Sequence, residues 1–324
     1  MSLKLQSISK RYGDKWILRD VSLEVKRGEI VGLIGENAVG KSTILRLVSG
    51  DESVNTGNIF FDEQEITASS VAERGFSFAQ DGEQASWKDL FRSTKSEDIS
   101  DGSKKKILIE KTLEGAHKVV LLDNPFSGMN YEMRDEVYEL LRHTVKERNI
   151  VLVIATNNLD SAFAVCDRLA ILQNGEIVQF DEPRALYEKP NSVAVARVLG
   201  RNNFIKAMRI TFNNQPTQEF QTLDGDHRLI TDKTERKGLG AINSAVTLAI
   251  RPEHISISFG ASFPEDNLLK AKIVDVRYLG ATTLLRLDAN GLILESLVLR
   301  LVGLNVGDEC MVGLPPDRFL VLKD

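Results

Sequence analysis

Residues 35–43 read Gly35-Glu36-Asn37-Ala38-Val39-Gly40-Lys41-Ser42-Thr43 and fit the pattern G-x-x-x-x-G-K-[ST]. The stretch follows an apolar run at 30–34 and precedes a helical pattern at 43–48, which is the strand, loop and helix context that the pattern requires. Its glycines let the backbone curl so that successive N–H groups point at phosphate oxygens, and the helix N-terminus adds a positive end. This stretch decides the fold, because it predicts an α/β unit that binds a nucleotide by its phosphates.

The side chains of this loop have distinct expected roles. Lys41 supplies a fixed positive charge to the phosphates, and Ser42 places its hydroxyl on Mg²⁺, which bridges the outer phosphate oxygens. A relic loop that keeps the turn but binds nothing is the alternative interpretation. The residues of the loop that are predicted to contact the nucleotide are Gly35, Asn37, Ala38, Gly40, Lys41, Ser42 and Thr43.

With 324 residues, the chain is long enough for two domains that each bury a core. Residues 1–200 alternate short apolar runs with helical patterns, which predicts an α/β domain with a largely parallel sheet. Residues 201–324 carry short strand-like runs separated by turn residues, which predicts a small all-β barrel or sandwich. No internal repeat is apparent in the sequence.

Composition excludes several classes of protein. A formal net charge of -5 provides no general basic field for a nucleic-acid backbone, so nucleic acid is not an expected partner. Cys166 and Cys310 lie far apart without metal-ligand spacing, which argues against a disulfide framework or a zinc site. No apolar run approaches the roughly 20 residues of a membrane helix, and the start of the chain lacks the apolar core of a signal peptide. We therefore expect a folded protein of the cytoplasm.

Further motifs follow in the order of the ATP-binding cassette (ABC) family, and the resemblance covers roughly residues 3–200. Tyr12 resembles the family's aromatic residue that stacks on adenine. Gln80, at the end of an apolar run, resembles the glutamine that touches Mg²⁺ and reports to a membrane partner. Asp123 ends another apolar run as the Walker B aspartate does, near the water shell of the metal. The resemblance implies MgATP as the ligand, with the metal at Ser42, Gln80 and Asp123.

The positions that should attack the nucleotide depart from the family. Asn124 stands where the family has a glutamate that polarises the attacking water, and an amide cannot accept a proton. Asn157 stands where the family has a histidine. Positioned acid–base groups contribute on the order of 10² to 10⁴ in rate, so we expect weak intrinsic hydrolysis. The predicted catalytic set, with its degenerate positions, is Gln80, Asn124 and Asn157.

The segment Ile99-Ser100-Asp101-Gly102-Ser103 resembles the family signature Leu-Ser-Gly-Gly-Gln, of which it keeps Ser100 and Gly102. In the family this element binds the γ-phosphate held by the opposite subunit, at a helix N-terminus that suits an anion. The aspartate adds a negative charge there, and the lysines at 104–106 either offset it or form a solvated helix face. Only about twenty residues separate Gln80 from Ser100. The family has a longer helical subdomain at this place, which grips a membrane subunit.

The run 174–190 resembles the end of an importer ATPase, and Arg251-Pro252-Glu253-His254-Ile255 resembles part of the transport-associated oligonucleotide-fold (TOBE) domain that follows such ATPases. The resemblance implies an importer subunit that pairs head to tail with itself or with another cassette ATPase, under permease subunits at the inner face of the cell membrane. The broken motifs leave an alternative open, which is a non-hydrolytic nucleotide-binding regulator or scaffold without a permease. For the TOBE-like domain, the implied uses are dimer contact and regulation, and a small oxyanion ligand stays open.

Overall fold

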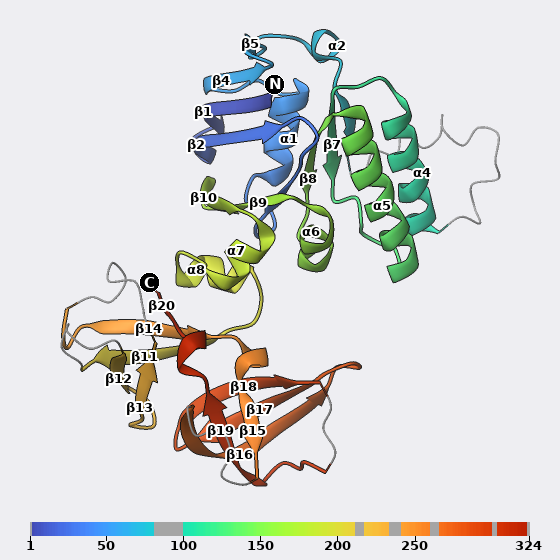
Figure 1. The fold of residues 1–324 in the computed structure, drawn as a ribbon. Coiled ribbons are helices and arrows are strands. Elements are labelled where there is room, and N and C mark those ends of the chain that lie inside the picture. The colour runs from blue at the N-terminus through green and yellow to red at the C-terminus, as the bar shows by residue number, and fades with distance from the viewer. Residues whose placement is uncertain are drawn as a thin grey trace. The chain divides into compact units, whose positions relative to one another are not determined.

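The computed structural model describes residues 2–80, 100–210, 217–232, 241–259, 266–299 and 303–322. The chain divides into two compact units, Met1–Glu188 and Lys189–Asp324, each with its own hydrophobic core (Figure 1). The first unit is α/β and the second is mostly β, as the sequence predicts.

The centre of the first unit is a six-stranded sheet in the order β10-β9-β3-β8-β7-β6. All of its neighbours pair in parallel except β10, which is antiparallel to β9. Strands β3 and β8 are buried along their whole length, as expected for parallel strands covered on both faces. The strands are β3 (Ile30–Ile34), β6 (Ser77–Ala79), β7 (Val119–Asp123), β8 (Val151–Ala155), β9 (Arg168–Gln173) and β10 (Glu176–Asp181).

A second, antiparallel sheet of the first unit has the order β2-β1-β4-β5. Its two long strands alternate buried and exposed residues, so one face contributes to the core that the parallel sheet and α1 also form. Its strands are β1 (Ser2–Tyr12), β2 (Lys15–Lys26), β4 (Thr56–Phe61) and β5 (Gln64–Glu65).

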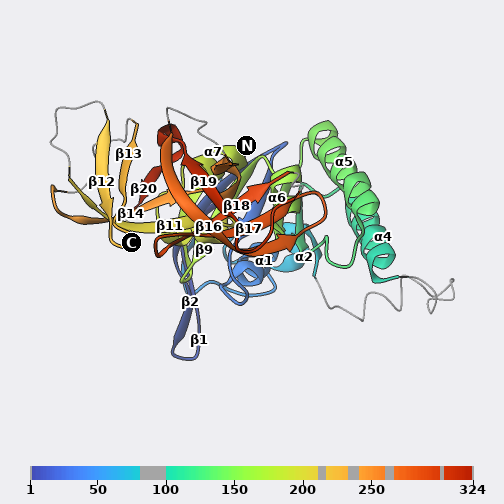
Figure 2. The ribbon, with the colours of Figure 1, turned by 90° about the horizontal axis from the view of Figure 1, so that it is seen from below.

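Six helices are described in the first unit. Within α5, Val137, Leu141 and Val145 are fully buried and form an apolar stripe on an otherwise charged helix. Figures 1 and 2 show α4 and α5 side by side. The helices are α1 (Lys41–Ser49), α2 (Val71–Arg74), α4 (Asp101–Glu114), α5 (Tyr131–Arg148), α6 (Leu159–Val165) and α7 (Pro183–Glu188).

The end of α1 is held by a buried arginine. The Arg74 guanidinium donates to the carbonyl oxygens of Leu47 at 2.6 Å and Val48 at 2.8 Å, which lie in the last turn of the helix. It also donates to the carbonyls of Thr67 and Ser69, each at 3.0 Å. These bonds satisfy carbonyls that have no partner within the helix, so the helix that begins at the phosphate loop is anchored at its far end.

The second unit contains two five-stranded antiparallel sheets, β13-β12-β11-β14-β20 and β15-β19-β16-β17-β18, which share one core. The helix α8 (Val193–Val198) belongs to this unit, because Ala196 is buried together with Ala249 and Leu322. The sequence placed the domain boundary after residue 200, whereas the structure groups the residues from Lys189 onward with the second unit. The strands are β11 (Asn203–Arg209), β12 (Gln218–Thr222), β13 (Arg228–Thr231), β14 (Ala245–Ile250), β15 (Ser256–Ser258), β16 (Asn267–Tyr278), β17 (Thr283–Ala289), β18 (Leu292–Val298), β19 (Glu309–Leu314) and β20 (Leu320–Leu322).

The second unit is built from an internal repeat, so the expectation of no repeat is wrong. Corresponding elements begin 64 residues apart: β11 and β16 (203 and 267), β14 and β19 (245 and 309), the 3-10 helices at 252 and 316, and β15 and β20 (256 and 320). The last strand of each half pairs in the other half's sheet, since β15 pairs with β19 and β20 pairs with β14. Identical residues are few at this offset, which is why only the pairing pattern exposes the repeat.

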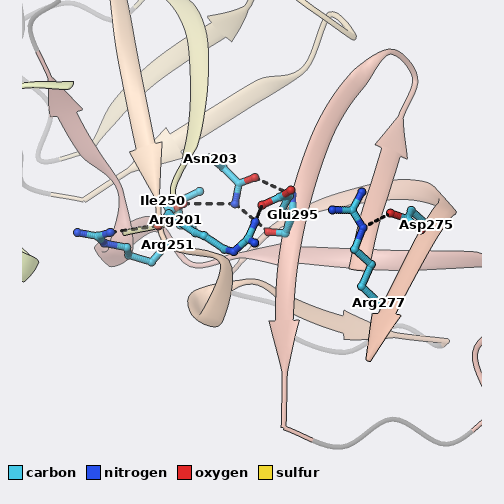
Figure 3. Close-up of polar contacts among 7 residues, drawn as sticks. All are labelled: Arg201, Asn203, Ile250, Arg251, Asp275, Arg277 and Glu295. Atoms are coloured by element: carbon cyan, nitrogen blue, oxygen red, sulfur yellow. Dashed lines mark hydrogen bonds and ion pairs between the residues drawn. The ribbon is translucent and has the colours of Figure 1, made fainter. Parts of the chain in front are cut away.

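Two asparagines at equivalent positions of the repeat join the sheets, and Figure 3 shows the contacts of the first, Asn203. The Asn203 side chain accepts from the Glu295 backbone N–H at 2.6 Å and donates to the carbonyls of Glu295 at 2.8 Å and Ile250 at 3.3 Å. Asn267 makes the matching set, accepting from the N–H of Ile230 at 2.6 Å and donating to the carbonyls of Ile230 and Leu314, each at 2.9 Å. Each amide therefore satisfies backbone groups of an edge strand, β18 or β13, that sheet pairing leaves open.

Candidate nucleotide site

The phosphate loop follows β3 and turns sharply into α1. Ala38 has φ 61 and Gly40 has φ 112, both in the left-handed region. A Cβ on Gly35 would lie 2.3 Å from the carbonyl oxygen of Leu172, so only glycine fits beside β9. Because α1 begins at Lys41 without a side-chain cap at Gly40, its first N–H groups are left for a ligand. The backbone thus has the curled form that the sequence predicts.

Lys41 lies across the base of this loop. Its Nζ donates to the carbonyl oxygens of Gly35 and Glu36, each at 2.8 Å. Burial lowers the pKa of Lys41 from its ordinary value, although the nearby negative charge of Asp123 acts in the opposite direction. A phosphate group would supply this partly desolvated ammonium with an anionic partner in addition to the nearby charge of Asp123.

A pocket of about 740 Å³ opens at this loop, a size typical of small-ligand sites. It brings together the predicted residues of the loop except Gly35, the strand ends and β1, with four residues that the sequence reasoning missed. Arg46 could have been found, because it lies one helical turn after Ser42 on the same face of α1. The predicted lining residues are Tyr12, Asn37, Ala38, Gly40, Lys41, Ser42, Thr43, Gln80, Asp123, Asn124 and Asn157, and the missed ones are Ile17, Arg46, Ala155 and Thr156.

The polar residues of three parallel strands meet at one edge of the pocket. Asp123 is the last residue of β7 and lies opposite Ala155 of β8, while Gln80 follows β6. Because the carboxyl ends of parallel strands meet at the same edge, residues separated by tens of positions face one ligand. Ser42, Gln80 and Asp123, which the resemblance assigns to Mg²⁺, all line the pocket.

The oxygen donors of this set suit Mg²⁺, which keeps several waters and takes one or two carboxylates besides phosphate oxygens. Within the ranges that the structure describes, no cluster of three or more His, Cys, Asp or Glu side chains could hold a metal. A hydroxyl, an amide and one carboxylate therefore need the phosphates of the ligand to complete a metal site.

The two amides at the degenerate positions face the same space. Asn124 adopts φ 48, a conformation that asparagine tolerates, and its backbone N–H donates to the carbonyl of Ala155 at 2.7 Å. The Nδ2 of Asn157 donates to Oδ1 of Asn37 at 3.3 Å, which links the end of β8 to the phosphate loop. Both side chains can orient a water or a phosphate oxygen by hydrogen bonds, but neither can take up a proton.

Ser100 and Gly102 do not line this pocket. Ser100 caps α4, where its side chain accepts from the N–H of Ser103 at 3.2 Å. Gly102 is packed so closely that a Cβ would lie 2.5 Å from the carbonyl oxygen of Gly128. The role of this helix start toward a second subunit stays a prediction, and the segment between Gln80 and Ser100, with Ile99, lies outside the described residues.

The lysines at 104–106 each have a partner within the chain. Lys104 lies 3.7 Å from Asp101, so the unusual aspartate of the signature segment has a positive neighbour on its own helix. Lys106 pairs with Glu136 of α5. Lys105 donates to the hydroxyl of Ser127 and, at 3.5 Å, to the carbonyl of Asn124. Lys105 and Lys106 therefore link α4 to neighbouring segments, whereas Lys104 pairs within the helix.

Comparison with known proteins fits this geometry. Residues 18–87 match the family model described as ABC transporter, and residues 248–322 match the TOBE domain. The chain therefore carries an ABC-type ATP-binding domain and a TOBE domain. Proteins of this family bind nucleotide. A crystal structure of the ADP conformation of an ATP-binding cassette of an ABC transporter aligns with this cassette protein at a TM-score of 0.54 and 20% identity, covering 61% of this chain and 99% of that one, which supports the fold.

Several curated import ATP-binding proteins are similar to this cassette protein over most of their length. The sulfate/thiosulfate import ATP-binding protein of Mannheimia succiniciproducens is 25% identical, over 86% of both chains. The spermidine/putrescine protein of Haemophilus ducreyi is 27% identical, over 90% of this chain and 87% of its own. The maltose/maltodextrin protein of Mannheimia succiniciproducens is 25% identical, over 100% and 96%. None of the helices described here is long and apolar enough to cross a membrane.

Proposed function

We propose that this chain is the ATP-binding subunit of an ABC-type importer, and that it binds MgATP strongly but hydrolyses it slowly. The single observation that carries the proposal is the phosphate loop, with its left-handed Gly40, its close-packed Gly35 and its Lys41 directed across the turn. The similarity to import ATP-binding proteins along the whole chain, including the TOBE domain, supports the importer assignment.

Slow hydrolysis follows from the two amides. A carboxylate at position 124 would accept the proton of the attacking water. The Asn124 amide can form hydrogen bonds with that water but cannot take its proton. Asn157 is neutral, so it stabilises the charge of the leaving phosphates less than a protonated histidine would. Gln80 and Asp123 keep their side-chain chemistry, which supports metal binding without supplying a base.

The partner in this proposal is a second cassette ATPase, either another copy of this chain or a different subunit, with permease subunits in the membrane. In a mixed pair, the site built on this chain's phosphate loop would be slow, whereas the other site would use Ser100 and Gly102 and could turn over normally. The chain would then work in the cytoplasm at the inner face of the membrane.

A non-hydrolytic regulator or scaffold is the second candidate function, and Asn124 and Asn157 are the observation that favours it. Purification of the tagged protein from native membranes separates the two functions. Recovery of integral membrane subunits in stoichiometric amounts supports the importer subunit. Recovery of the chain without any membrane subunit, under detergents that preserve other transporters, supports the regulator.

Calorimetric titration with MgATP tests the nucleotide site itself. We expect a Kd in the micromolar range or tighter for the isolated protein, together with turnover well under about 1 per second, the low end of ordinary enzymes. Absence of MgATP binding would reject the site, and turnover at or above that rate would reject the slow-hydrolysis proposal.

A further inference from the structure

A carboxylate outside the predicted set fixes the ring of Tyr12. Glu52 lies three residues after the end of α1, and its Oε2 accepts from the Tyr12 hydroxyl at 2.5 Å. Lys10 approaches the same oxygen at 3.3 Å, and Nε of Arg46 approaches the other oxygen at 2.9 Å. Glu52 therefore ties the end of β1 to the end of the helix that follows the phosphate loop.

The charges of this cluster keep Glu52 an acceptor and Tyr12 a donor. Burial alone would raise the pKa of Glu52, but hydrogen bonds from Tyr12 and Lys10 and the charge of Arg46 outweigh it and lower that pKa. The pKa of Tyr12 is raised, mainly by burial and then by the hydrogen bond to Glu52. At neutral pH the pair is thus a phenol donating to a carboxylate, which is a strong, charge-assisted bond.

The geometry determines which part of Tyr12 is left for a ligand. The ring lines the pocket and 44% of the residue's surface is exposed, while its hydroxyl is occupied by Glu52. Lys10 lies 5.3 Å from the ring centroid, which further restricts the ring. A ring held in place before the ligand arrives does not lose rotational freedom on binding, so less affinity is spent on ordering it.

We propose that Glu52 is a positioning residue for the nucleobase, which holds Tyr12 so that a ring face, and not the hydroxyl, meets the base. The inference rests on the proposed function, since it assumes that a nucleotide occupies the pocket. Stacking tolerates any base with a π face. Tyr12 should therefore add affinity for the base without distinguishing ATP from GTP through a hydrogen bond.

The test compares MgATP with magnesium tripolyphosphate, which has the phosphates but no base. The Kd of each is measured by competition with a fluorescent nucleotide, for the wild type and for Tyr12→Ala, Tyr12→Phe and Glu52→Ala. We expect Tyr12→Ala to weaken MgATP binding by about 30-fold, the middle of the range for base stacking. Glu52→Ala and Tyr12→Phe should each weaken it by roughly two- to tenfold, the cost of ordering one side chain. Tripolyphosphate affinity should change by less than about twofold, after correction for the loss of one negative charge as measured in the charge-control variant.

Two readouts distinguish positioning from a general structural effect. Glu52→Ala and Tyr12→Phe remove the same bond, so their combination should cost no more than either one alone. Glu63→Gln removes one exposed negative charge outside the pocket and serves as the matched charge control. If Glu52→Ala leaves the ratio of MgATP affinity to tripolyphosphate affinity unchanged, the inference is overturned. The nucleotide site itself is not affected by that result. If the wild type binds neither ligand, the proposed function fails first and this inference fails with it.

Discussion

The phosphate loop and the strand ends opposite it line one pocket, and they differ in how well they match the predicted motifs: the loop matches throughout, whereas two strand-end positions, 124 and 157, do not. The loop works through backbone N–H groups, whose positions depend on Gly35, Gly40 and the packing of β3 against β9. The strand ends present single side-chain atoms, and amides stand at 124 and 157 where the resemblance implies a carboxylate and an imidazole. Binding and turnover can therefore separate, because a side chain can be replaced without disturbing the backbone that seats the phosphates.

Removal of the loop's cation should have the largest effect. Lys41→Ala takes away the ammonium that we propose contacts the phosphates, and hydrogen bonds to charged groups contribute about 1.5–3 kcal/mol each. We expect MgATP affinity to fall by about 100-fold or more in a calorimetric titration. Lys118→Ala, which removes an exposed lysine outside the pocket, should bind as the wild type does. Equal affinity of Lys41→Ala and wild type would show that the loop is a relic.

Introduction of a carboxylate at position 124 should raise the rate of ATP hydrolysis. Asn124→Glu supplies a proton acceptor at the end of β7, and we expect turnover to rise about 10- to 100-fold with little change in MgATP affinity. Combination with Asn157→His should raise it further than either change alone if both positions limit the reaction. The control is Asn124→Gln, which adds the extra length without the charge.

A rise in Asn124→Gln equal to that in Asn124→Glu would assign the effect to shape rather than to proton transfer. Position 124 has φ 48, which a glutamate adopts at a cost of about 1–2 kcal/mol. The thermal midpoint of Asn124→Glu should therefore fall by a few degrees, and the turnover measurement belongs well below that midpoint.

High pH should weaken MgATP binding, and it should do so at a lower pH than the pKa of an exposed lysine would suggest. Burial lowers the pKa of Lys41, so in the free protein this ammonium loses its proton at a lower pH than an exposed lysine does. Only the protonated form attracts phosphate. We expect MgATP affinity to stay constant near neutral pH. It should then fall as the pH rises, and the fall should begin before about pH 10, where an ordinary lysine loses its proton. An affinity that holds constant through that range would show that the charge of Lys41 is not used.

The contact between the two regions should have the smallest effect. Asn157→Ala removes the bond to Asn37, and a neutral hydrogen bond contributes about 0.5–1.5 kcal/mol. We expect MgATP affinity to fall by roughly two- to tenfold, with turnover still slow. Asn158→Ala, at the neighbouring cap of α6, is the matched control outside the pocket lining. An affinity loss as large as that of Lys41→Ala would mean that Asn157 helps to form the loop itself.

Sequence reasoning reached most of the pocket because its motifs are local. The loop, Asp123 and the two amides each follow a buried strand, and parallel strands bring their carboxyl ends to one edge. Ile17 and Glu52 carried no such signal, since they reach Tyr12 and the loop only through the pairing of distant segments. The repeat of the second unit gave no signal in the sequence, because its two halves have strands at corresponding positions but few identical residues. The repeat became visible only from the pairing of the strands.

By itself, the sequence determined the phosphate loop, the parallel sheet around it and the amide that stands at position 124, because each depends on neighbouring residues and their spacing. Only the tertiary structure decided that Glu52 holds Tyr12, that Arg74 anchors α1, and that two asparagines join the sheets of the second unit. Those contacts join residues from 26 to 92 positions apart, where no local period or spacing limits which side chains meet.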